Sequence, residues 1–124
     1  MTKELNIGIV GLGTVGSGVI KSIEKNKEYF KNNYDVKFNI IGISANSKNK
    51  ERSFDVDSYN WFDEPLELIS EKNIDTIIEL VGGEDGLAYE LAINSLKNKM
   101  NFITANKALI SKHGEELASL SEKN

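Results

Sequence analysis

The sequence contains no cysteine, and only one proline and one histidine, among its 124 residues. Disulfides, thiolate metal ligands and a cysteine nucleophile are therefore excluded from this chain. No apolar run approaches the roughly 20 residues that a membrane-spanning helix needs. The first residues, with Lys3 and Glu4, lack the apolar core of a secretory signal. We therefore expect a cytoplasmic protein with no membrane partner and no metal site.

An excess of basic residues is also missing. Lys and Arg number 15 against 19 Asp and Glu, which gives a net charge of −4. Because a nucleic-acid binder usually shows a basic stripe, we expect no nucleic-acid partner. An anionic cofactor is not excluded, since a helix N-terminus can bind an anion locally. The length suits one folded domain with its own core, spanning residues 1–124.

The most informative pattern is Gly11-x-Gly13-x-x-Gly16, which directly follows an apolar strand at 5–10 and opens an amphipathic helix at Thr14. The three glycines alone are weak evidence, but this context is that of a dinucleotide fold. Gly11 permits a tight turn, Gly13 lets backbone amides approach a pyrophosphate, and Gly16 allows close packing of the helix. The alternative is a glycine-rich turn that binds nothing.

Strands and helices alternate along the rest of the chain. Strands are predicted at 5–10, 38–43, 74–81 and 101–104, and helices from 14, over 63–69, over 86–98 and from 111. Residues 25–35 either extend the first helix or form a loop, and 44–57 read as a loop with a possible short strand or turn at 54–56. This order indicates an α/β, Rossmann-type, doubly wound fold: a mostly parallel sheet with helices on both faces.

In such a sheet, ligands bind at the carboxyl ends of the strands. The loops after Val10, Ile43, Val81 and Thr104 are therefore the candidate site. Gly82 and Gly83 would let the backbone pass close to a cofactor, or would simply form a turn. Glu79 interrupts an apolar strand, where an acid is costly unless hydrogen-bonded. We expect it to point towards the strand end or to pair with a backbone amide.

The loop after the second strand bears on cofactor choice. An acid at this strand end usually selects NAD by binding the ribose 2′-hydroxyl. The usual spacing of about 20 residues past the glycines reaches Asp35, before the strand begins. The strand end itself carries no acid, only Ser44, Ala45, Asn46, Ser47 and Lys48. This favours NADP, or a site for both NADP and NAD. Alternatively, Lys48, Lys50 and Arg52 simply belong to a solvated loop.

Lys107 and His113 are the remaining candidates for chemistry. Lys107, preceded by Asn106, comes shortly after a strand end, where a cation could bind an amide or carboxylate or polarise a carbonyl oxygen. It could equally be a surface lysine at a helix start. His113 lies beside Gly114 in a helix-start context, and we expect it to be solvated or capping. We assign no catalytic residue to this chain.

Three motifs in order, Gly11-Leu-Gly-Thr-Val-Gly16, Glu79-Leu-Val-Gly-Gly83 and Thr104-Ala-Asn-Lys-Ala-Leu109, resemble the amino-terminal domain of homoserine dehydrogenase. The piece Ala45-Asn-Ser-Lys48 is also similar to sequences of forms fused to aspartokinase. The resemblance covers essentially the whole chain. It implies an enzyme that oxidises L-homoserine to L-aspartate 4-semialdehyde with NAD(P)⁺, or runs the reverse, in threonine and methionine biosynthesis.

The resemblance also implies roles for individual residues. The pyrophosphate would be held by Gly11, Gly13, Thr14, Val15 and Gly16. The adenosine ribose would be surrounded by residues Ser44 to Lys48, although forms that select NADPH often have an arginine where this chain has Ser44. The nicotinamide ribose would be bordered by Gly82 and Gly83 after Val81, and the nicotinamide by Asn106 and Lys107.

Members of that family continue into a substrate-binding and dimerisation region, and full-length forms are expected to be homodimers or larger. We expect that region to be absent from this chain, and the chain alone to bind nucleotide without turning over homoserine. Two other readings remain open at this point. One is another Rossmann-type dehydrogenase for an amino-acid-derived substrate, and the other is a dinucleotide-sensing module without catalysis.

Overall fold

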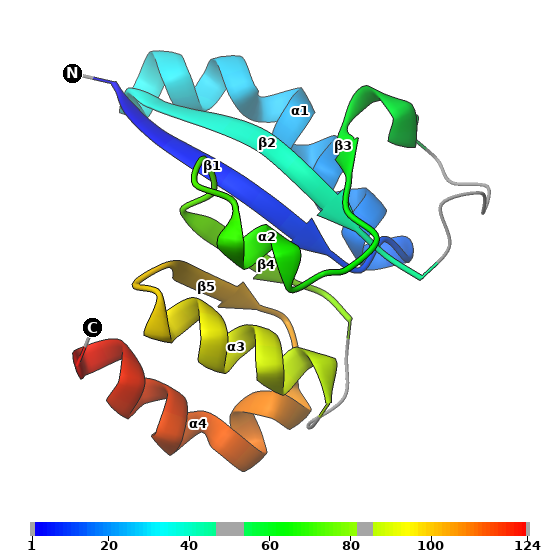
Figure 1. Ribbon diagram of the computed structural model, residues 1–124. Coiled ribbons are helices and arrows are strands. Elements are labelled where there is room, and N and C mark those ends of the chain that lie inside the picture. Colours follow the sequence, from blue (N-terminus) through cyan, green and yellow to red (C-terminus); the bar gives the residue numbers. More distant parts are fainter. Residues whose placement is uncertain (1, 47–53, 82–85, 124) are drawn as a thin grey trace.

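The structure, a computed structural model, describes residues 2–46, 54–81 and 86–123 (Figure 1). Five parallel strands form one sheet in the order β3-β2-β1-β4-β5. In chain order the elements are β1 (Lys3–Val10), α1 (Thr14–Tyr34), β2 (Val36–Ser44), the 3₁₀ turn η1 (Val56–Ser58), β3 (Asn60–Trp61), α2 (Glu67–Ser70), β4 (Thr76–Glu79), α3 (Leu87–Lys97), β5 (Asn101–Thr104) and α4 (Lys107–Lys123).

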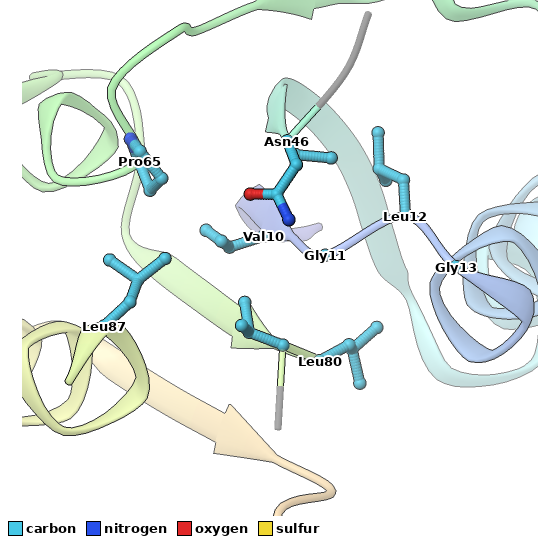
Figure 2. Close-up of a pocket in the computed structure, with 10 residues that line it drawn as sticks. Val10, Gly11, Leu12, Gly13, Asn46, Pro65, Leu80 and Leu87 are labelled. Atoms are coloured by element: carbon cyan, nitrogen blue, oxygen red, sulfur yellow. The ribbon is translucent and has the colours of Figure 1, made fainter. Parts of the chain in front are cut away.

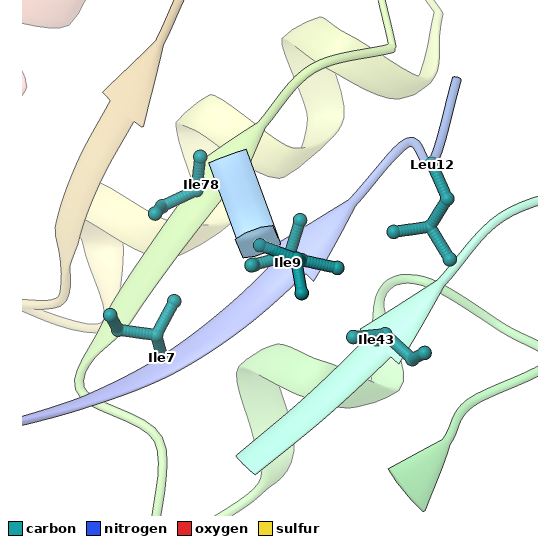
Figure 3. Close-up of a cluster of buried hydrophobic side chains, with 6 residues drawn as sticks. Ile7, Ile9, Leu12, Ile43 and Ile78 are labelled. Atoms are coloured by element: carbon teal, nitrogen blue, oxygen red, sulfur yellow. The ribbon is translucent and has the colours of Figure 1, made fainter. Parts of the chain in front are cut away.

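Helices cover both faces of the sheet, as the alternation of elements predicts. On one face, Ile20 of α1 packs in one cluster with Ile7 and Ile9 of β1 and Ile43 of β2. Figure 3 shows these three strand side chains. The opposite face is covered by α2 and α3, and α4 packs on α3 at the edge of the molecule (Figure 1). The α/β doubly wound fold is therefore confirmed, and its sheet is parallel throughout.

The chain builds the sheet outward in two directions from β1. It passes from β1 to β2 and β3 on one side, then returns to place β4 and β5 on the other side of β1. The strand order thus reverses between β1 and β4. In open parallel sheets, the carboxyl ends of the strands at such a reversal form the crevice that binds ligands.

Four predicted strands are confirmed, and the one over 101–104 has the predicted bounds. The polar stretch 25–35 extends α1 to Tyr34, where Asp35 adopts the left-handed conformation with φ 54° and ends the helix. The two-residue strand β3 was not predicted, because so short an edge strand has no detectable periodicity. The prediction of a last helix from Ser111 is wrong by one turn, since α4 begins at Lys107.

Asp35 lies at the amino end of the sheet, the end opposite the candidate site. Its carbonyl accepts a hydrogen bond from the Lys3 N–H at 2.9 Å, and its carboxylate accepts one from the Thr2 hydroxyl at 2.7 Å. The acid reached by counting 20 residues past the glycines therefore cannot bind a ribose at the carboxyl end. Among the described residues, no helix is long and apolar enough to span a bilayer.

Candidate functional site

A pocket of about 280 Å³ opens at the carboxyl ends of β1, β2 and β4 (Figure 2). Its wall combines the glycine turn with side chains from four other segments, most of them apolar. The lining residues are Val10, Gly11, Leu12, Gly13, Ala45, Asn46, Pro65, Leu80, Val81 and Leu87. The side chain of Asn46 extends into the space between them (Figure 2). The pocket lies at the reversal of strand order, where the sheet topology predicts a ligand.

The turn from β1 into α1 can be made only with glycine at two positions. Gly11 has φ +97°, and a Cβ there would lie 2.7 Å from the Leu80 carbonyl carbon. A Cβ on Gly16 would lie 2.0 Å from the Gly11 carbonyl oxygen, so the first turn of α1 packs directly on the loop. Both glycines therefore do the structural work that the motif predicts, and they hold the start of α1 beside the pocket.

Gly13 differs, because its missing side chain leaves space for a ligand. A Cβ built on it meets no protein atom within 4 Å, and its backbone is in an extended conformation that any residue can adopt. Gly13 is the N-cap of α1, without a side-chain cap hydrogen bond, and the first turn carries no acid. The backbone N–H groups that open α1, together with the helix dipole, therefore suit an anion. These residues fit the diphosphate of a dinucleotide.

The second strand ends beside this turn. The Ser44 carbonyl accepts a hydrogen bond from the Gly11 N–H at 2.9 Å. The Ser44 side chain is fully buried, and its hydroxyl has no hydrogen-bond partner among the described residues. Ser44 therefore supports the pocket from behind, while Ala45 and Asn46 form its surface. The predicted ribose contacts Ser47 and Lys48 lie outside the described residues.

The exit of β4 forms the opposite wall. Val81 lines the pocket and is 44% exposed. Its N–H donates to the carboxylate of Glu79 at 2.8 Å, so Glu79 does pair with a backbone amide, one of the two arrangements expected for it. Gly82 and Gly83, which follow, lie outside the described residues.

Two further residues predicted to hold the pyrophosphate lie at the start of α1. Val15 is exposed on α1, and Thr14 begins that helix.

Asn106 and Lys107 line a second, more open hollow at the start of α4, together with Thr104, Ile110 and neighbouring residues. Asn106 is buried and caps α4, since its Oδ1 accepts from the Leu109 N–H at 2.9 Å. Lys107 is therefore the first residue of the helix and is exposed. A cation is disfavoured there by the helix dipole, so helix stability does not explain this lysine.

Several lining residues were not singled out from the sequence. Pro65 and Leu87 enter the wall from separate segments before α2 and at the start of α3. Only the three-dimensional crossing of the chain brings them to the glycine turn. Leu12 could have been found, because it lies inside the glycine motif. The prediction for His113 is wrong: it lies inside α4, its side chain is only 16% exposed, and its ring packs on Tyr89 with centroids 4.2 Å apart.

The hydroxyl of Tyr59, between η1 and β3, has a pKa above its ordinary value. Burial raises the pKa of the Tyr59 hydroxyl, and the nearby negative charge of Glu24 and a hydrogen bond to that carboxylate raise it further. Tyr59 packs against the core beneath α1 and does not line either hollow. Within the described part of the chain, no group of three or more His, Cys, Asp or Glu could hold a metal ion.

Comparison with known proteins matches residues 11–124 to the family described as homoserine dehydrogenase, NAD binding domain. Homoserine dehydrogenase of Neisseria gonorrhoeae is 34% identical over 121 residues, and that of Helicobacter pylori is 37% identical over 117 residues. These alignments cover 98% and 94% of this chain. A crystal structure of S. aureus homoserine dehydrogenase superposes with a TM-score of 0.90 at 35% identity, covering 99% of this chain.

The chain spans only part of these relatives. It corresponds to 27% of the length of the two curated enzymes and to 30% of the S. aureus chain. The aligned part includes the glycine turn, the pocket-lining residues from Gly11 onward and the start of α4, because the family match runs from Gly11 through residue 124.

Proposed function

The chain belongs to the homoserine dehydrogenase family as its NAD-binding domain, and from this premise we propose that its pocket binds the dinucleotide of an enzyme that interconverts L-homoserine and L-aspartate 4-semialdehyde. The observation that carries the proposal is the uncapped N-terminus of α1 at Gly13, opening into a pocket at the reversal of strand order. The proposed pathway is threonine and methionine biosynthesis, and the proposed compartment is the cytoplasm.

Each wall of the site has a distinct task in this proposal. The backbone amides at the start of α1 bind the diphosphate, and Gly11 and Gly16 hold that helix end in place. Leu80, Val81 and Leu87 exclude water from one side of the bound ligand. The nicotinamide end extends towards Asn106 and Lys107, where the Lys107 ammonium can orient a carboxamide or a substrate carboxylate. When bound, the nicotinamide supplies the site that accepts or returns a hydride.

For the cofactor itself, we propose NADP, or both NADP and NAD. The described end of β2, from Ser44 to Asn46, carries no acid. A carboxylate at this strand end would bind a ribose 2′-hydroxyl and repel a 2′-phosphate. The cations that would attract the phosphate, Lys48 first among them, are predicted from the sequence alone. Loss of a 2′-phosphate preference in Lys48→Ala would support their role, and an unchanged preference would contradict it.

We further propose that substrate binding and dimerisation belong to a region outside residues 1–124. The chain spans 27% of its curated relatives. Of the described residues that line the two hollows, none is acidic, so none of them could bind the amino group of homoserine by charge. We expect no homoserine-dependent reduction of NADP⁺ by this chain alone. Turnover measured spectroscopically with the isolated chain would contradict this.

Two glycine substitutions in the same helix region test the binding proposal. Gly13→Asp places a carboxylate into open space at the N-cap of α1, where an acid is compatible with folding. We expect it to weaken dinucleotide binding by at least about tenfold, since a charge repels the diphosphate at close range. Gly18→Ala is the matched control, because its Cβ also meets nothing and it does not line the pocket.

Isothermal titration with NAD⁺ and NADP⁺ would measure both variants against the unmodified chain. The proposal predicts saturable binding that Gly13→Asp weakens and Gly18→Ala leaves unchanged. No binding by the unmodified chain, or equal binding by Gly13→Asp, would overturn the assignment of this pocket.

A further inference from the structure

Glu79 is the only acidic or basic side chain among the fully buried residues that the structure describes. It is the last residue of β4 and is paired in register with Thr104, the last residue of β5. Burying a carboxylate is costly even when it is hydrogen-bonded, and an apolar residue of similar volume often gives equal stability. The presence of an acid here therefore points to a task other than cohesion of the sheet.

The carboxylate joins the two walls of the candidate site. One oxygen, Oε2, accepts from the Val81 N–H at 2.8 Å, in the wall of the first pocket. The other, Oε1, accepts from the Thr104 hydroxyl at 2.5 Å, in the wall of the second hollow. A single side chain thus links the exits of β4 and β5 by hydrogen bonds.

The connection continues to the first residue of α4. Thr104 Oγ1, whose proton is directed to Glu79, accepts in turn from the Asn106 N–H at 2.9 Å. The Asn106 side chain then caps α4 by accepting from the Leu109 N–H. Since Lys107 immediately follows this cap, its backbone position depends on an unbroken series of hydrogen bonds that begins at Glu79.

We propose that Glu79, through Thr104, is a positioning residue for the nicotinamide end of the dinucleotide. It fixes where Val81 and the start of α4 stand relative to each other, and so where Lys107 meets the ring. The inference rests on the proposed function, because it requires a dinucleotide to lie across the two hollows. The diphosphate is assigned to the amides at the start of α1, which lie outside the series Glu79–Thr104–Asn106.

The proposal can be tested by comparing the binding of ligands with and without the nicotinamide. NADPH carries the nicotinamide, and 2′-phospho-ADP-ribose is the same molecule without it; NADH and ADP-ribose form a second pair. For each variant, the ratio of the two dissociation constants isolates the contribution of the nicotinamide end. The fluorescence of the reduced nicotinamide adds a spectroscopic measure of its surroundings.

Thr104→Val removes the donor of the Glu79–Thr104 bond. Glu79→Gln leaves one acceptor oxygen where the carboxylate has two, so the new side chain cannot accept from both Val81 and Thr104. Both changes keep the side-chain volume nearly constant. We expect either variant to lower the nicotinamide-dependent gain in affinity about tenfold, as removal of a hydrogen bond to a charged group does. The affinity for 2′-phospho-ADP-ribose should stay unchanged. Thr76→Val is the matched control: Thr76 is also buried on β4, and its hydroxyl accepts from the Asn101 amide of β5, but at the amino end of the sheet.

The outcomes are distinct. A selective loss in Glu79→Gln or Thr104→Val, with Thr76→Val like the unmodified chain, supports the proposal. The proposal is overturned if the variants bind both ligands of a pair equally more weakly, or if the ratio of the two dissociation constants does not change. It is also overturned if the unmodified chain binds NADPH no more tightly than 2′-phospho-ADP-ribose. If Glu79→Gln does not fold, Thr104→Val alone decides. Failure of the unmodified chain to bind 2′-phospho-ADP-ribose and ADP-ribose would instead refute the proposed function itself.

Discussion

A Cβ on Gly16 would lie 2.0 Å from the carbonyl oxygen of Gly11, the closest approach that any described glycine would create. The last glycine of the motif therefore packs against the first. This contact sets how deeply α1 enters the turn and so where its N-terminal amides point. The pocket depends on the backbone of the turn more than on any polar side chain in it.

This contact makes Gly16→Ala a strongly destabilising substitution. The clash is with backbone and cannot be relieved by a side-chain rotation, so we expect a loss of at least about 2 kcal/mol in the free energy of unfolding. Gly18→Ala, two residues further along α1, should instead stabilise the chain by roughly 0.5–1 kcal/mol. Urea unfolding followed by circular dichroism would measure both. Equal stability of the two variants would contradict the described packing.

Asn46 allows a test of the proposed preference for the 2′-phosphate. Asn46→Asp introduces an acid on the pocket surface at the end of β2. We expect NADP⁺ to bind about tenfold more weakly, because the carboxylate repels the 2′-phosphate, while NAD⁺ binding is kept or improved. Asn94→Asp, an exposed position on α3 outside the pocket, is the charge-matched control. Equal weakening of both cofactors would count against this placement of the ribose.

At position 107 we expect the stability of α4 and the binding of the ligand to favour different residues. As a cation at the N-terminus of α4 it opposes the helix dipole, so Lys107→Glu should raise the melting temperature by about 1–5 °C. Lys97→Glu, in the last turn of α3, should lower it for the opposite reason. Thermal unfolding at low salt measures both effects. A lower melting temperature in Lys107→Glu would show that the lysine serves the helix, contrary to the functional role proposed for it.

The raised pKa of Tyr59 predicts how stability changes at high pH. The unfolded chain loses this proton at its ordinary value of 10.0, before the folded chain does. The stabilisation is therefore fully present below about pH 10 and is lost as the pH rises through the folded-state pKa. Urea unfolding of the unmodified chain and of Tyr59→Phe from pH 8 to 11 would show this. A constant difference between the two over that range would contradict it.

The sequence predicted those parts of the site that local chemistry determines. The glycine spacing after an apolar strand located the turn at Gly11, and the alternation of strands and helices predicted the parallel sheet. Pro65 and Leu87 could not be found in this way, since only the crossing of the chain brings them into the wall. The start of α4 was missed although Asn106 is of a residue type preferred at helix N-caps, so a local signal for it was present.

For Glu79, the sequence predicted one hydrogen-bond partner and not the other. An acid in an apolar strand predicted a hydrogen-bonded carboxylate, and the bond to the Val81 N–H confirms it. Its second partner, Thr104, is 25 residues away in the chain. That pairing depends on the register of β4 against β5, which hydrophobic periodicity does not determine.

The proposed function depends on one interaction, in which the amides at the start of α1 bind the diphosphate of a nicotinamide dinucleotide. Backbone amide chemical shifts, followed by NMR during a titration with NADP⁺, test it most directly in a chain of 13.8 kDa. We expect the largest changes at Gly13 to Gly16, with smaller ones at Asn46 and Val81 and none at Thr76 or Asn101. Unmoved resonances at Gly13 to Gly16, with NADP⁺ bound elsewhere, would contradict it.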